Sequence, residues 1–313
     1  MITARPIIIR GAMVTASSVA YPDAGETAWA NTTAYVVGDT RSYLIGDLYH
    51  KFECKLDHTS DTATGKVPEA YPDDENNSYW IDRGAVNEFA PFQLERNTQN
   101  DAPSPYYVNV DPGERFTTVA VGNAIADDVT LDVYDESSVL KSSETKRLLV
   151  RDVYSWYDWL YQPHRQIKKT IFADLPAVST YTFKLTFTRG AGNVRVGAII
   201  PGVAFDIGNA QYKAKVTREN FTSFNRAFDG EAKIKKRRNV PSNMLQLIQK
   251  KSKIDGIKNL MDDLNGEVTF WSGIVETTDG YFESLFTIGL YKSYSYSLEG
   301  PLESLADIEI QEL

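Results

Sequence analysis

The sequence has 313 residues, of which 42% are hydrophobic and 24% are charged, a composition typical of a globular protein with two or three domains. The formal net charge of −9 argues against a general nucleic-acid-binding protein, because such a protein needs a basic face for the phosphates. The 18 tyrosines, against four methionines, favour a mainly β fold, since aromatic side chains pack well on a pleated surface.

Residues 1–26 are predicted to form an extended N-terminal arm and a linker. Ile7, Ile8 and Ile9 are a β-branched triplet in a segment that is too short to bury itself. We therefore expect the arm to add a strand to another domain or to a neighbouring subunit, and the three isoleucines are candidate interface residues. The arm lacks the long apolar region of a signal peptide, and no run of about 18 apolar residues follows, so we expect no membrane insertion.

Residues 27–86 are predicted to form a compact unit of short strands. Two alternating segments around Gly46 and Asp47 indicate a β-hairpin over residues 42–56. The only cysteine, Cys54, lies in this hairpin, so the sequence provides neither an internal disulfide nor a cysteine-rich zinc site. The polar stretch 57–78 is expected to be a long loop, and its acidic residues lack the spacing of a calcium-binding loop.

Residues 87–205 are predicted to form an antiparallel β-sandwich of the jelly-roll kind. Its strands are expected where apolar and polar residues alternate between turns, at 115–124, 129–136, 168–175, 180–189 and 193–200. In the fourth segment Tyr181, Phe183, Leu185 and Phe187 share one face, as a sheet with one buried face requires.

An aromatic segment interrupts these strands at residues 153–163. It holds Tyr154, Trp156, Tyr157, Trp159 and Tyr161. The segment is either a bulky connection that packs on the sandwich or a subunit interface, in which Trp156, Tyr157 and Trp159 are candidate anchors because such residues concentrate binding energy. A platform for sugars is a third alternative.

Residues 206–313 are predicted to be a mixed region with one or two helices. Helical spacing of apolar residues over 243–264 indicates helix, divided at Gly256, and strands are expected at 267–276, 281–300 and 305–313. The basic run 233–238 is either a solvated strand that pairs with acidic neighbours or a contact with an acidic partner subunit or nucleic acid.

Familiar catalytic motifs do not occur in the sequence. It lacks the serine nucleophile elbow, the phosphate-binding loop, the dinucleotide-binding glycine pattern and the paired histidines of zinc proteases. We therefore expect a protein without enzymatic activity, cofactor or metal.

Residues 29–80 resemble the small chitin- and cellulose-binding modules of bacterial glycosidases. The family pattern is an initial Trp, Tyr-x-x-Gly-Asp, a Tyr-x-x-Gly-x-x-Tyr hairpin, a polar loop with Pro and a closing Trp. The matching residues here are Trp29, Tyr35, Gly38, Asp39, Tyr43, Gly46, Tyr49, Pro68 and Trp80.

This resemblance implies a module core built by Trp29, Tyr35, Tyr43, Tyr49 and Trp80. It also implies that exposed aromatic rings bind sugar by stacking on it. The segment 54–58, where the family has its aromatic pair, contains no such pair. The candidate glycan-binding residues are therefore Tyr71 and Tyr79, and a purely structural module is the favoured alternative.

Modules of this kind also occur in tail proteins of bacteriophages. There the module is followed by an Asn-x-aromatic-x-x-Phe segment, a β-sandwich and a mixed C-terminal region, and residues 87–92 and 224–230 resemble that arrangement. The resemblance implies a structural or adaptor component of a tailed-phage virion tail, such as a baseplate, ring or fibre-attachment protein. Its partners would be other tail proteins and copies of itself in a symmetric homo-oligomer, made in the host cytoplasm, without nucleic acid.

Two other functions are open at this point. The first is a carbohydrate-binding protein that contacts glycans of the host surface directly. The second is a glycoside hydrolase or depolymerase with an accessory module, although the roughly 230 remaining residues are few for such a catalytic domain.

Overall fold

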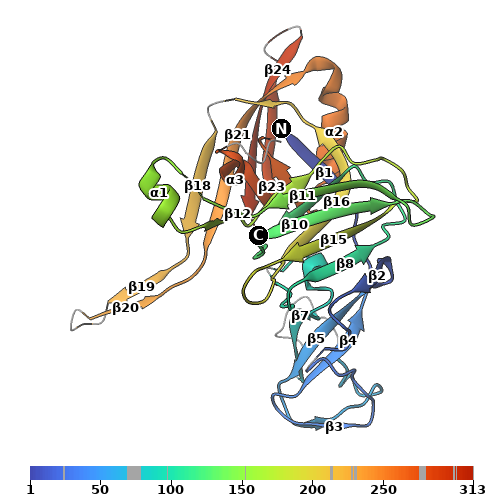
Figure 1. The fold of residues 1–313 in the computed structure, drawn as a ribbon. Helices are drawn as coiled ribbons and strands as arrows, with labels where there is room; N and C mark the ends of the chain where they lie inside the picture. Colours follow the sequence, from blue (N-terminus) through green and yellow to red (C-terminus); the bar gives the residue numbers. More distant parts are fainter. Residues whose placement is uncertain are drawn as a thin grey trace. The chain divides into compact units, whose positions relative to one another are not determined.

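The computed structural model describes residues 1–23, 25–68, 79–96, 98–151, 153–211, 214–226, 228, 231–274, 280–298, 300 and 302–312. The protein is mainly β, with several antiparallel sheets, one of them curled into a half-barrel, and a few short helices (Figure 1). The chain forms two compact units. The first unit comprises residues 1–6, 117–119 and 200–313, and the second comprises residues 7–116 and 120–199.

The first unit is built on one antiparallel sheet. Within this unit the strand order is β16-β1-β22-β23-β24-β21-β17, and β18 also pairs with β21. Strands β19 and β20 form a separate two-stranded ribbon. The strands are β1 (Ile2–Pro6), β16 (Ala198–Asp206), β17 (Asn209–Ala210), β18 (Lys215–Asn220), β19 (Ser223–Arg226), β20 (Ala232–Lys235), β21 (Asn239–Lys250), β22 (Thr269–Ser272), β23 (Phe286–Ser297) and β24 (Glu303–Glu312).

The helices of the first unit are short. A 3-10 turn at Lys251–Lys253 leads into α2 (Ile254–Asp263), and α3 (Phe282–Leu285) precedes β23. Apolar residues of α2 pack on one face of β21 and β24 to form the core. This core contains Leu245, Leu247, Ile257, Leu260, Met261, Leu264, Trp271, Ala306, Ile308 and Ile310.

The helix predicted over residues 243–250 is wrong. These residues belong to β21, which pairs with β24 on one side and with β17 and β18 on the other. Burial along β21 alternates, since Leu245 and Leu247 are buried and Met244 is exposed. The segment forms a strand, with alternate residues buried, because both of its edges pair with other strands. Gly256 does not divide a helix either, because it lies inside α2.

The N-terminal residues join the first unit as a strand. β1 pairs with β16 on one side and β22 on the other, so the strand that we expected from the arm is added within its own chain. Ile7 and Ile9 are buried and Ile8 is exposed.

The second unit holds a five-stranded sheet and several smaller sheets. The order of the five strands is β11-β10-β15-β8-β2. These strands are β2 (Val14–Ser17), β8 (Tyr106–Val110), β10 (Asp128–Tyr134), β11 (Leu140–Arg147) and β15 (Thr182–Thr188). Phe183, Leu185 and Phe187 of β15 are all buried, as their alternation predicts.

Smaller elements complete the second unit. β4 (Thr40–Ile45), β5 (Leu48–Cys54) and β7 (Trp80–Ala85) form a three-stranded sheet, β3 (Ala34–Tyr35) pairs with β6 (His58–Thr59), and β12 (Leu149–Val150) pairs with β13 (Arg165–Gln166). The remaining elements are β9 (Thr118–Gly122), β14 (Thr170–Phe172), α1 (Trp156–Tyr161) and two 3-10 turns at Gly11–Met13 and Ala90–Phe92. Strands β9 and β16 run from one unit into the other.

Candidate functional site

The segment that resembles a carbohydrate-binding module has a very small core. Its fully buried residues are Tyr35, Phe52, Cys54 and Trp80. The indole of Trp80 meets the rings of Tyr35 and His58 edge-on, with centroids 5.1 and 5.2 Å apart. The segment therefore owes its packing to a few aromatic side chains, of which Trp80 is the largest.

The other aromatic residues expected in this core lie around it. Trp29 and Tyr43 are half-buried and meet in a T-shaped contact, with their centroids 5.6 Å apart. Tyr49 packs against Tyr21, with centroids 4.4 Å apart, and stacks on Phe89. Tyr49 therefore joins the segment to the residues before and after it.

The candidate glycan residues give no open platform among the described residues. Tyr71 lies outside them. Tyr79 is half-buried, with its ring 4.9 Å from that of His58 and below the ammonium group of Lys66. Every described aromatic ring between residues 27 and 86 is buried or half-buried. A pyranose ring stacks on an open aromatic face, and no described ring in this segment is exposed enough to offer one.

Asn87, from the segment that resembles phage tail proteins, works as a structural clamp. Its side-chain amide donates to Asp23 Oδ2 (2.8 Å) and to the carbonyl of Asp101 (3.0 Å). Its side-chain oxygen Oδ1 accepts from the backbone N–H of Asp101 (2.8 Å), and its backbone N–H donates to Glu26 Oε1 (2.8 Å). Phe89 and Phe92 of the same segment are buried. Asn87 thus joins residues 23–26, before the small sheet, to Asp101, which follows it.

A buried carboxylate, Asp82, strengthens the same region. It accepts from the N–H of Gly84 (2.8 Å), lies 3.2 Å from His50 Nδ1 and pairs with Arg96 at 3.1 Å. Burial acts most strongly on its pKa and raises it. The opposing effects are larger in sum, and the pKa of Asp82 therefore lies below its usual value. They are the hydrogen bonds from His50 and Gly84 and the charges of His50 and Arg96.

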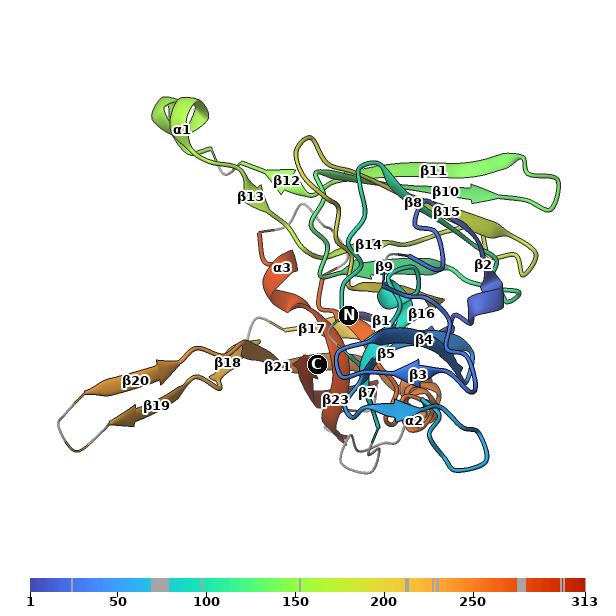
Figure 2. The same cartoon turned by 90° about the horizontal axis from the view of Figure 1, so that it is seen from below.

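Helix α1 lies at the end of the β12–β13 ribbon (Figure 2), and its aromatic side chains are exposed to solvent. Ser155 caps it by accepting from the N–H of Asp158. The exposed fraction is 84% for Trp156 and 57% for Trp159, and Tyr157 is also exposed. The alternative that this segment packs on the sandwich is therefore wrong, because its rings contact mainly each other. Pairs within the helix are Trp156 with Trp159 and Tyr157 with Tyr161.

The ribbon of β19 and β20 is a second projecting element. It continues the β18–β21 ladder and extends away from the sheet, as Figures 1 and 2 both show. Phe224 and Ile234 oppose each other on one face, and both are more than half exposed. Lys233 and Lys235 occupy the other face. The acidic neighbours that we expected for this basic run are absent from β19, whose sequence is Ser-Phe-Asn-Arg.

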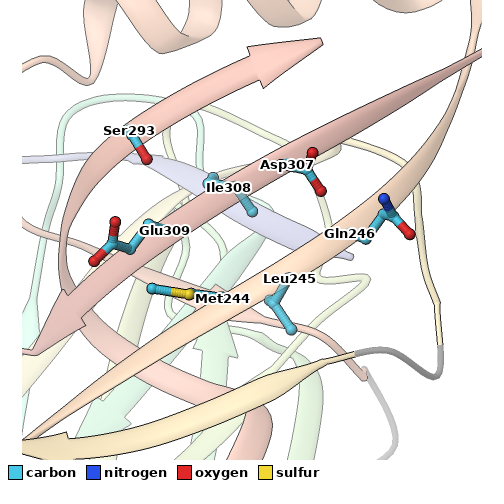
Figure 3. A pocket seen from close by; sticks show the side chains of 7 residues that line it. All are labelled: Met244, Leu245, Gln246, Ser293, Asp307, Ile308 and Glu309. Atoms are coloured by element: carbon cyan, nitrogen blue, oxygen red, sulfur yellow. The ribbon is translucent and has the colours of Figure 1, made fainter. Parts of the chain in front are cut away.

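The face of the first unit's sheet that points away from α2 carries a shallow depression. Its volume is about 320 Å³, and Figure 3 shows its lining from close by. Asp307 and Glu309 of β24 and Ser293 of β23 contribute polar side chains, and Met244 of β21 contributes an apolar one. The complete lining is Met244, Leu245, Gln246, Ser293, Asp307, Ile308 and Glu309.

The described residues contain no group of three or more His, Cys, Asp or Glu side chains placed to hold a metal ion. In the same part of the chain no helix is both long and apolar enough to cross a membrane. Comparison with models of known families, with curated proteins and with solved structures found no match to this chain. The fold and the exposed side chains thus define a mainly β protein with two projecting elements.

Proposed function

We propose that this protein is a non-enzymatic structural or adaptor component of a tailed-phage virion tail, where it joins neighbouring proteins in a baseplate, ring or fibre-attachment assembly. The assignment to a virion tail is supported by the resemblance of residues 29–80 and 87–92 to segments of phage tail proteins. The assignment to assembly is supported by the projecting elements.

One observation carries the proposal of an assembly role. Trp156 and Trp159 are exposed on a six-residue helix at the end of a two-stranded ribbon. Large exposed apolar patches are rare on monomeric proteins and mark interaction sites. Tryptophan and tyrosine carry much of the binding energy at protein interfaces because they bury a large area for little lost conformational entropy. The helix therefore has the composition of an anchor that enters a partner's pocket.

The finer fold assignment belongs to the same proposal. Residues 27–86 are a carbohydrate-binding-like module, and residues 87–205 are a sandwich of the jelly-roll kind. The half-buried position of Tyr79 and the clamp made by Asn87 favour a structural use of the module, as a spacer or docking domain, over direct contact with a glycan.

The test is a double substitution in the phage that encodes the protein. Trp156→Ser with Trp159→Ser should leave the purified protein folded, with an unchanged melting temperature, and should cause particles with incomplete tails to accumulate. The matched control is Val139→Ser with Leu140→Ser, which also replaces two exposed apolar residues. Intact tails and wild-type titre in the tryptophan variant would contradict an anchoring role for α1.

A further inference from the structure

The β19–β20 ribbon has two faces of different chemistry. Its register places Ser223 opposite Lys235 and Asn225 opposite Lys233, and opposed side chains of an antiparallel pair share a face. We call this face, which holds no apolar side chain, the polar face. Asn225 and the two lysines are exposed on it. The apolar cross-strand pair described above lies on the opposite face, so the two kinds of side chain point away from each other.

The ribbon and the ladder that carries it are basic, although the chain as a whole is acidic. Residues 215–240 contain eight lysines and arginines against three acidic residues, a net charge of +5, whereas the whole chain carries −9. Of the three acidic residues, Glu219 lies in β18, and Asp229 and Glu231 come between β19 and β20 in the sequence. Among the described residues no carboxylate forms an ion pair with Lys233 or Lys235. No described residue therefore neutralises the charge of the polar face.

The polar face lies away from the acidic residues of the first unit's sheet. The ribbon continues the β18–β21 ladder, and β24 pairs with this ladder only from Ser242 onward. The chain from Lys233 to Ser242 spans roughly 25–30 Å when extended. Figures 1 and 2 both show the ribbon leading away from the sheet. Because charges are screened over about 8 Å at physiological ionic strength, an anion bound to the polar face feels little repulsion from the sheet.

The composition of the polar face fits nucleic acid better than protein or lipid. The core of a protein interface is rich in aromatic and apolar residues and poor in charge, whereas protein–DNA interfaces are polar and strongly basic. An element that lies on an anionic membrane buries its apolar face in the lipid, and in this ribbon that orientation would turn the lysines away from the headgroups. Lysine binds phosphates, and asparagine and serine hydrogen-bond to base edges.

The shape of the ribbon fits the major groove of duplex DNA. This groove is about 12 Å wide and admits a two-stranded β-ribbon, whose strands lie about 4.8 Å apart. Each strand of the ribbon has four residues. That length is roughly 13 Å, or about four base pairs at a rise of about 3.4 Å. β19 contributes the short polar side chains of the polar face and β20 the long cationic ones.

We propose that the β19–β20 ribbon binds duplex DNA with its polar face in the major groove. Lys233 and Lys235 contact phosphates, and Asn225 faces the base edges. Arg237 and Arg238, which follow β20, extend the phosphate contacts toward β21. The apolar pair points out of the groove and takes no part in the contact. The net charge of −9 argues against DNA binding over the whole surface, and the proposal confines it to the ribbon. This activity goes beyond the anchoring role proposed for α1.

The test measures binding of a short, fluorescently labelled DNA duplex to the full-length protein by anisotropy at several salt concentrations. The ribbon variant carries Lys233→Gln with Lys235→Gln. The matched control, Lys168→Gln with Lys258→Gln, neutralises two exposed lysines outside the ribbon. A third variant, Lys233→Arg with Lys235→Arg, keeps the charge of the polar face. Circular dichroism and melting curves should be the same for all four proteins, because every substituted side chain is exposed.

The wild type, the control and the arginine variant should bind the duplex, with the logarithm of the affinity falling linearly with the logarithm of the salt concentration. Each phosphate contact contributes about 0.9 to this slope, so the slope of the ribbon variant should be smaller by about 2. Its affinity at about 0.1 M salt should be at least about tenfold lower.

Three results would each overturn the proposal. The first is that the wild type does not bind the duplex, and the second is that the ribbon variant keeps the slope of the wild type. The third is displacement of the duplex by poly-glutamate or by phosphatidylglycerol vesicles at an equal concentration of charge, which would assign the ribbon to an acidic protein or to a membrane surface. Because α1 is not part of the ribbon, none of these results changes the anchoring role proposed for it.

Discussion

Trp80→Ala should unfold the small sheet of β4, β5 and β7 before the rest of the protein. The exposed fraction of Trp80 is 1%, and it is the largest of four fully buried residues in this core. Removal of the indole deletes its edge-on contacts with Tyr35 and His58 and leaves a cavity that so small a core cannot refill. Truncation of a buried tryptophan costs about 3–5 kcal/mol, which is most of the stability expected of a module this size.

Hydrogen–deuterium exchange followed by mass spectrometry is the direct assay, because it reports local opening. Amides of β4 and β5 should lose protection in Trp80→Ala by a factor of about 100 or more, since 1.4 kcal/mol corresponds to a factor of ten. The matched control is Trp156→Ala, which removes the same side chain from an exposed site and should change stability by less than about 0.5 kcal/mol. Equal protection of β5 in the wild type and in Trp80→Ala would refute the reasoning.

Three further outcomes are expected. Gly289→Ala should destabilise the first unit by about 1–3 kcal/mol in urea unfolding, because a Cβ at this position overlaps the carbonyl oxygen of Gln311. As a control, Gly256→Ala in α2 places its Cβ in open space and should be neutral or stabilising by up to about 1 kcal/mol. The pKa of Asp82 is lower in the folded than in the unfolded protein, so the stability that this carboxylate contributes is complete above the unfolded pKa of about 3.9 and is lost as the pH falls through the folded pKa. The melting temperature of the wild type should therefore drop more steeply below about pH 4 than that of Asp82→Asn. A fragment of residues 25–86 should not bind chitin or cellulose oligomers in NMR titrations. Saturable binding at micromolar concentrations would favour the alternative function, a carbohydrate-binding protein that contacts glycans directly.

Strands with one buried face could be predicted from the sequence alone. β15 is an example, because Phe183, Leu185 and Phe187 alternate with polar residues and the strand is paired on both edges inside a sheet. Residues 243–250 were predicted wrongly because the helical period and the strand period both fit the apolar positions there. The choice was made by strands distant in sequence, chiefly β24, which no local pattern reveals.

The surroundings of several other segments could not be predicted from the sequence either, because they depend on strands and contacts distant in the chain. The sequence around Trp156 fits a packed connection as well as an exposed interface, and its exposure follows from where the ribbon of β12 and β13 ends. The amphipathic pairing of Phe224 with Ile234 depends on the register of β19 and β20, which the sequence alone does not fix. Asn87 was noticed through a resemblance, yet its role as a clamp became visible only with its hydrogen bonds to Asp23 and Asp101.

The position and copy number of the protein in intact virions test the central proposal most directly. Mass spectrometry of purified particles, combined with cryo-electron microscopy of the tail, would measure both. We predict that the protein is present in the tail, in a fixed copy number set by the symmetry of the assembly, with α1 buried against a neighbouring protein. Absence from purified particles, together with activity of the pure protein on polysaccharide, would contradict this account.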